Sequence, residues 1–266
     1  MMEQGEKLIE GLKIMLSLFP NAKGVIGIED NKPEAIKLMT ELLAQVKIDG
    51  INFKVETLPS RYPQGAEKVL IDQCTGREVP PGKLPSDVGC VVMNVTSIAV
   101  LADYVKTGMP LTTKRLTVDG SAITKPMNVR VPIGTPIKDI VEFCGGYKGT
   151  PAKLISGGPM MGMALVTDDF PILKQNNGIL VFDEKDAKSS PTTNCIRCGR
   201  CVNACPMGLM PTRLESYTEL GNAEELKKLN IMNCMECGCC AFVCPADRKL
   251  VHAIKIGKGI VRNAGI

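Results

Sequence analysis

The chain has 266 residues, of which 44% are apolar and only 4% aromatic, and its formal net charge is +4. This length and apolar content allow two or three compact units with aliphatic cores. The small net charge argues against a nucleic-acid-binding protein. Without a run of 18 apolar residues we expect no membrane span, and without an apolar stretch or small-residue cleavage site in residues 1–20 we expect no secretory leader.

The first hundred residues alternate between helical and strand patterns. Apolar residues recur at helical spacing over residues 3–19, and a short β-rich run follows at 23–28. A second helix is expected from Pro33 to about Val46, capped by Asp30 or Asn31. Residues 51–58 then alternate as a strand. This succession predicts a βαβ unit with a right-handed crossover.

The middle of the chain changes from a loop to short strands. Residues 59–90 are rich in proline and glycine, so we expect a long loop with one short helix at 63–73, followed by a helix at 95–106. From about Thr112 a helix is predicted at 136–144, with Thr135 as its cap and Gly145-Gly146 as its stop. Strands are predicted at 114–118, 127–131, 153–155 and 178–182. Together they resemble a small β-grasp module.

The last part of the chain is expected to be helical around cysteines. A polar linker at 184–193 precedes it, and helices are predicted at roughly 207–219, 222–230 and 247–262. The last of these is a basic amphipathic helix. Its basic face either attracts an acidic partner or docks on a membrane-bound one, or it is a solvated face of a helix packed on the core.

Eight of the twelve cysteines form two copies of the spacing C-x2-C-x2-C-x3-C-P. This is the bacterial ferredoxin pattern for two 4Fe-4S clusters, in which the fourth cysteine of each run ligates the other cluster. Many cysteines without a leader also indicate metal binding in a reducing cytosol. The spacing therefore predicts an electron-transfer protein with crossed ligation. One cluster would be held by Cys195, Cys198, Cys201 and Cys244, and the other by Cys234, Cys237, Cys240 and Cys205.

Alternatives remain open around these cysteines. Structural zinc is one, although zinc ribbons usually show separated C-x2-C pairs. Cys239 either competes as a ligand or is a buried spectator thiol. Arg197 and Arg200 flank the first cluster, where they either raise its potential, dock an acidic partner or are simply solvated.

Six segments of the chain resemble one family. Besides the two cysteine runs, they are IGIEDNKPEAI at 26–36, YPQGAEKVLI at 62–71, VPIGTPI at 131–137 and ISGGPMMG at 155–162. In this order they are similar to the C subunit of the Rnf electron-transport complex, which is related to the NADH-oxidising flavoprotein of respiratory complex I. The resemblance covers nearly the whole chain.

This resemblance implies an α+β multidomain fold in three parts. Residues 1–111 would be a partial α/β flavin- and NADH-binding domain, 112–184 a β-grasp, soluble-ligand-binding domain, and 185–266 a ferredoxin-like domain with two 4Fe-4S clusters. The family's glycine-rich loop for FMN and the dinucleotide is missing here. We therefore expect an N-terminally truncated subunit, and whether this fragment binds FMN or NADH stays open.

Four residues of the first part match positions near flavin and nicotinamide in the complex I flavoprotein. Gly65 and Glu67 lie in the YPQGAEK segment, and Asn94 and Thr96 lie in VVMNVTS. The resemblance implies that they contact FMN or NADH. Glu67 is equally well explained as a solvated helix residue.

The resemblance also implies a function and partners. The chain would be the electron-transfer subunit of an ion-translocating ferredoxin:NAD⁺ oxidoreductase, with NADH or ferredoxin as redox partner and the other Rnf subunits at the membrane. It would lie peripherally on the cytoplasmic face, and by itself it would only transfer electrons. Three alternatives remain: a related subunit serving cobalamin or amino-acid reduction, a zinc-stabilised interaction module, and a stand-alone ferredoxin-like adaptor.

Overall fold

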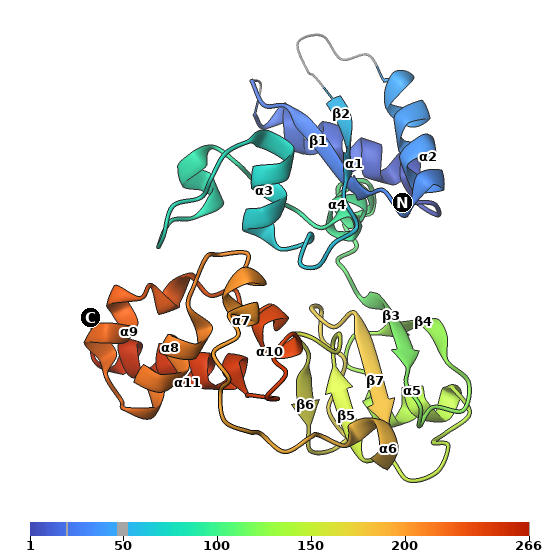
Figure 1. The fold of residues 1–266 in the computed structure, drawn as a ribbon. Coiled ribbons are helices and arrows are strands. Elements are labelled where there is room, and N and C mark those ends of the chain that lie inside the picture. The colour runs from blue at the N-terminus through green and yellow to red at the C-terminus, as the bar shows by residue number, and fades with distance from the viewer. Residues whose placement is uncertain (20, 47–52, 266) are drawn as a thin grey trace. The chain divides into compact units, whose positions relative to one another are not determined.

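The protein forms two compact units, Met1–Pro110 and Leu111–Ile266. The computed structural model in Figure 1 describes residues 1–19, 21–46 and 53–265. Among these residues no helix has both the length and the apolar character needed to cross a membrane.

The first unit is built on a parallel strand pair. Its elements are α1 (Gly5–Ser17), β1 (Gly24–Glu29), α2 (Pro33–Ala44) and β2 (Phe53–Leu58). Strand β1 runs parallel to β2 with Gly24 opposite Phe53, which confirms the βαβ arrangement. The start of the predicted second strand, residues 51–52, lies outside the described residues.

The predicted cap of α2 is wrong. Lys32 occupies the N-cap position, and no side chain caps the helix. The carboxylate of Asp30 instead accepts a hydrogen bond from the Ser60 N–H at 3.1 Å, and the Asn31 side chain accepts one from Lys32 at 3.0 Å. Both candidate caps are thus engaged elsewhere, and the proline in the first turn starts the helix without them.

Two more helices complete the first unit, α3 (Glu67–Thr75) and α4 (Val95–Thr107), with a short 3₁₀ turn at Pro85–Val88 between them. The helix predicted at 63–73 begins later because hydrogen bonds from Gln64 N–H to Arg61 O and from Ala66 N–H to Pro63 O close turns there. The core joins side chains of α1, β1, α2 and α4, including Leu8, Ile26, Met39 and Ile98.

The second unit opens with a five-stranded sheet in the order β4-β3-β7-β5-β6. Its strands are β3 (Thr113–Asp119), β4 (Met127–Pro132), β5 (Lys153–Ser156), β6 (Met163–Leu165) and β7 (Gly178–Phe182). Strand β3 pairs with β7 in parallel, and the other pairs are antiparallel. Helix α5 (Ile137–Phe143) buries Ile137, Ile140 and Val141 in one core with the sheet residues Val118 and Ile179.

Two sequence predictions about this sheet need correction. Strand β6 was not predicted, because it is only three residues long and mostly exposed, and its sequence does not alternate between apolar and polar residues. Thr135 does not cap α5: Pro136 is the N-cap residue, and the Thr135 hydroxyl donates to Pro132 O at 2.9 Å. The predicted glycine stop is confirmed, with φ of 85° at Gly145 and 79° at Gly146.

The rest of the second unit is helical. Its elements are α6 (Glu184–Ala187), α7 (Arg200–Asn203), α8 (Pro211–Glu219), α9 (Ala223–Lys228), a 3₁₀ turn at Ile231–Asn233, α10 (Cys239–Phe242) and α11 (Leu250–Asn263). The short helix α6 lies where only a polar linker was expected, and Asp183 caps it. Helices α8, α9 and α11 pack around Leu214, Leu226 and Ile254.

Candidate metal centres

The cysteines lie on two copies of one loop. In the first copy Arg197 and Gly199 have φ of 57° and 75°, and in the second Glu236 and Gly238 have φ of 59° and 89°. This left-handed backbone directs the N–H of Arg197 toward the preceding cysteine, and it donates to Cys195 Sγ at 3.4 Å. Glu236 N–H donates to the Cys234 thiol sulfur at the same distance. Such bonds stabilise a negatively charged thiolate.

Each loop continues in the same way. The short helices α7 and α10 carry Cys201 and Cys240, and each loop reaches its fourth cysteine just before a proline. The proline cannot donate to the chain and restricts the cysteine before it to extended geometry. The long helices α8 and α11 then begin at equivalent places.

The fourth cysteine of each run lies with the other run. One cavity is lined by Cys234, Cys237 and Cys240 together with Cys205. The other cavity is lined by Cys195, Cys198, Cys201 and Cys244. The structure thus brings together each of the two predicted sets of four thiols. We call Cys195, Cys198, Cys201 and Cys244 the first thiol set and their cavity the first cavity. Cys234, Cys237, Cys240 and Cys205 are the second thiol set, in the second cavity.

The chemistry of these donors fits a four-iron cluster. Each set offers four sulfur donors, and a 4Fe-4S cluster takes four cysteine thiolates, one for each iron. The four thiolates therefore need not converge on a single atom. In the ranges 1–19, 21–46 and 53–265, no three or more Cys, His, Asp or Glu side chains gather closely enough to hold a single metal ion.

The two sets differ in exposure. Cys195 and Cys198 of the first set are exposed, whereas Cys237 and Cys240 of the second are each 7% exposed. Burial raises the pKa of Cys240 to about 12. In the second set, metal binding must therefore displace protons from thiols that hold them tightly.

A buried cation lies beside the second set. Lys258, 7% exposed, donates to the backbone oxygen of Cys234 at 2.6 Å and to Glu236 at 2.7 Å. Burial alone would raise the pKa of Glu236, but Lys258, helped by Lys255 at 3.7 Å, outweighs it and holds that pKa below its usual value. The sequence indicated a basic helix face here but not that one of its lysines is buried.

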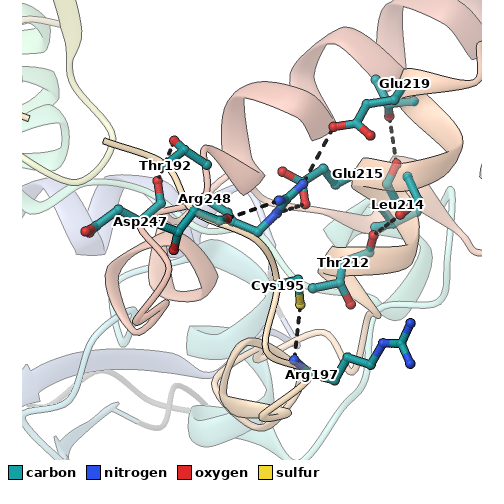
Figure 2. A network of polar contacts seen from close by, with 12 residues as sticks. Thr192, Cys195, Arg197, Thr212, Leu214, Glu215, Glu219, Asp247 and Arg248 are labelled. Carbon is teal, nitrogen blue, oxygen red and sulfur yellow. Dashed lines mark hydrogen bonds and ion pairs between the residues drawn. The ribbon is translucent and has the colours of Figure 1, made fainter. Parts of the chain in front are cut away.

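A charged network supports the first set (Figure 2). Arg248 pairs with Glu215 at 2.6 Å and reaches Glu219 at 3.6 Å, joining the start of α11 to α8. Arg197 and Arg200 are exposed, and both line the first cavity. Nothing in the sequence indicated the ion pair between Glu215 and Arg248, because the two residues lie 33 positions apart in the chain.

The four residues matched to flavin and nicotinamide contacts all lie in the first unit and are exposed. Gly65 has no atom within 4 Å of where a Cβ would be, and Glu67 opens α3. Asn94 accepts a hydrogen bond from Thr96 N–H at 2.9 Å, so its side chain caps α4.

Gln64, beside Gly65, was not singled out from the sequence. Its side chain is 2% exposed, and neither amide atom finds a hydrogen-bond partner among the described residues. A buried amide without a partner is costly. The Gln64 amide therefore carries a donor and an acceptor that no described residue satisfies.

Three sequence families match successive parts of the chain. They are the Nuo51 FMN-binding domain over residues 1–103, the SLBB domain over 115–164 and the 4Fe-4S dicluster domain over 194–248. They confirm the predicted fold class, with a flavin-binding α/β part, a β-grasp part and a two-cluster part.

Curated relatives match along nearly the whole chain. The C subunit of the proton-translocating ferredoxin:NAD(+) oxidoreductase complex of Clostridium ljungdahlii is 47% identical to this chain. The match covers all of this chain and 57% of the relative's length. The C subunit of the Na(+)-translocating complex of Acetobacterium woodii is 43% identical over 97% of the chain and 57% of its own. The C subunit of the ion-translocating oxidoreductase complex of Rhodobacter capsulatus is 41% identical over 97% of this chain and 49% of its own length. The chain spans about half the length of these relatives.

A solved structure shares the fold. It belongs to an NAD+-reducing [NiFe]-hydrogenase in the H2-reduced state, with a TM-score of 0.60 over 97% of this chain and 52% of the other. The sequence identity is 15%, so the likeness concerns the fold alone.

Proposed function

The chain belongs to the family of the Rnf-complex C subunits, and from this premise we propose that it transfers electrons within an ion-translocating ferredoxin:NAD⁺ oxidoreductase. The observation that carries the proposal is the pair of crossed thiol sets. When bound, 4Fe-4S clusters supply centres that exchange single electrons.

We assign Cys195, Cys198, Cys201 and Cys244 as ligands of one cluster and Cys234, Cys237, Cys240 and Cys205 as ligands of the other. Crossing the fourth ligand holds two clusters in one small helical region, since each loop contributes to both. The N–H groups of Arg197 and Glu236 stabilise sulfur charge, and burial of Cys237 and Cys240 keeps water from the second centre. No side chain needs to move a proton for this task.

Features of the first unit favour a flavin-binding role, in which electrons would pass from the flavin to the two clusters. Its match to an FMN-binding domain and the unpartnered amide of Gln64 favour FMN or NADH near residues 64–67. We propose Gly65, Glu67, Asn94 and Thr96 as contacts of FMN or NADH. Glu67 opens α3, and Asn94 also caps the start of α4. NADH or ferredoxin would then be the redox partner, and other subunits of the complex would hold the chain peripherally at the cytoplasmic face of the membrane.

A redox titration followed by electron paramagnetic resonance tests this proposal. Anaerobically purified protein should show two one-electron centres that become paramagnetic on reduction. Protein that stays silent on reduction contradicts an electron-transfer role. Co-purification with membrane subunits, rather than with a cobalamin or amino-acid reductase, separates this function from the related one.

A further inference from the structure

The second cavity holds one thiol more than a cluster needs. It is lined by five cysteines, namely Cys205, Cys234, Cys237, Cys239 and Cys240. A 4Fe-4S cluster takes four thiolates. The first cavity has only four thiols, because Arg200 stands where the second loop has Cys239.

The extra thiol lies against a proposed ligand. Cys239 and the proposed ligand Cys237 line the same cavity and are separated by a single residue of the chain. Gly238, with φ of 89°, separates the two and turns the chain so that both side chains line one cavity. Cys239 is only half-buried and begins α10, so its side chain lies at the end of a helix, outside the packed core.

We propose that Cys239 is a reserve ligand of the second centre that replaces Cys237 when that thiolate leaves its iron. This inference rests on the proposed function, since it presupposes a cluster bound by the second set. In the exchange the Cys239 S–H bond breaks and a bond from its sulfur to iron forms, while the Cys237–iron bond breaks and the Cys237 sulfur takes up the proton. Charge and oxidation state are unchanged, so no oxidant or reductant is required.

The reserve thiol gives the two centres different tolerance to the loss of one ligand. Removing Cys237 leaves four thiols around the second cavity, whereas removing its counterpart Cys198 leaves three around the first. A centre with three thiolates has one iron without a cysteine and is expected to lose it.

The test compares Cys237→Ala, the double variant Cys237→Ala/Cys239→Ala, and the matched control Cys198→Ala, all purified anaerobically without added thiols. Iron, acid-labile sulfide and the paramagnetic resonance spectrum are measured. Cys237→Ala should keep about eight iron per chain, with a changed signal from the second centre only. The double variant and Cys198→Ala should each lose iron from one centre and show a three-iron signal.

The proposal is overturned if Cys237→Ala matches the double variant in iron content and spectrum. The unchanged signal of the first centre shows that the variant is folded. If that signal is lost too, Cys237→Ser is compared with Cys237→Ser/Cys239→Ala by the same two criteria. Wild-type protein without iron would instead refute the proposed function itself, which keeps the two failures apart.

Discussion

Lys258 is the charged side chain that most directly distinguishes the surroundings of the two thiol sets. A buried ammonium group is tolerated only with partners, and Lys258 has the Glu236 carboxylate and the carbonyl of Cys234. Burial raises the pKa of the Cys234 thiol, and the charge of Lys258 opposes that rise. The same charge should favour the more negative, reduced state of a cluster held there.

Replacing Lys258 by methionine should therefore lower the reduction potential of the second centre. The variant should also lose about 1–3 kcal/mol of stability, because Glu236 and the Cys234 carbonyl lose their donor. Lys255→Met is the matched control, since Lys255 is half exposed and reaches the same carboxylate only at 3.7 Å. Redox titration and urea unfolding measure both effects, and equal potentials in the two variants would contradict this role.

Tyr147 gives the β-grasp part a pH dependence of its own. Its hydroxyl donates to Asp168 at 2.6 Å, and burial, together with this bond, raises the pKa of the tyrosine well above 10.0. The native state therefore holds the proton more tightly than the unfolded chain. This contribution to stability is complete below pH 10 and is lost as the pH rises above it.

Tyr147→Phe should accordingly be less stable than the wild type below pH 10, and the difference should shrink at higher pH. Urea unfolding followed by circular dichroism over a pH series measures this. A difference between the two proteins that stays constant through pH 10 would show that the Tyr147 proton plays no part.

At the scale of elements, the turns before α7 and α10 set the geometry of both thiol sets. Gly199 and Gly238 stand at equivalent places with φ of 75° and 89°, where a side chain costs about 1–2 kcal/mol. Their surroundings differ: a Cβ on Gly199 would meet nothing within 4 Å, whereas one on Gly238 would lie 3.0 Å from the Met160 oxygen.

Gly199→Ala should thus cost about 1–2 kcal/mol of stability and leave both clusters in place. Gly238→Ala should cost more and disturb the second centre, because backbone strain and the Met160 contact add. Thermal unfolding and iron analysis of the two variants compare them directly. An equal loss of stability in both variants would mean that Met160 moves away from the added Cβ of residue 238 at no cost.

The cysteine spacing predicted which thiols share a cavity, because it matches the two-cluster pattern in which the fourth cysteine of each run crosses to the other run. The βαβ unit and the sheet strands were also predictable, since alternation and helical periodicity report burial within one element. What sequence reasoning missed depends on distant contacts. Strand β6 exists only through its pairing with β5, and Asp30 is engaged by Ser60 across 30 residues.

Charged residues were the least predictable part of the candidate site. Lys258 looks like any lysine on a basic helix, and its burial follows from packing near Cys234 and Glu236. Gln64 stands in a segment that the sequence did mark, but its burial without a hydrogen-bond partner could be seen only in the structure.

At the scale of the whole molecule, the division at Pro110 and Leu111 separates flavin-type and metal-binding parts. All eight proposed ligands lie in the second unit, together with the β-grasp sheet. Residues 111–266 produced alone should therefore keep both centres and retain no flavin. Iron analysis and the flavin absorbance of this piece check the prediction, and a piece that folds but holds less than half the iron of the full chain would refute it.

The central claim, two crossed thiol sets that each hold a 4Fe-4S cluster, is tested most directly by counting metal and sulfide in the anaerobically purified 266-residue chain. We expect about eight iron and about eight acid-labile sulfide per chain, in a brown protein without stoichiometric zinc. Two zinc ions per chain, with no sulfide and no colour, would contradict the account.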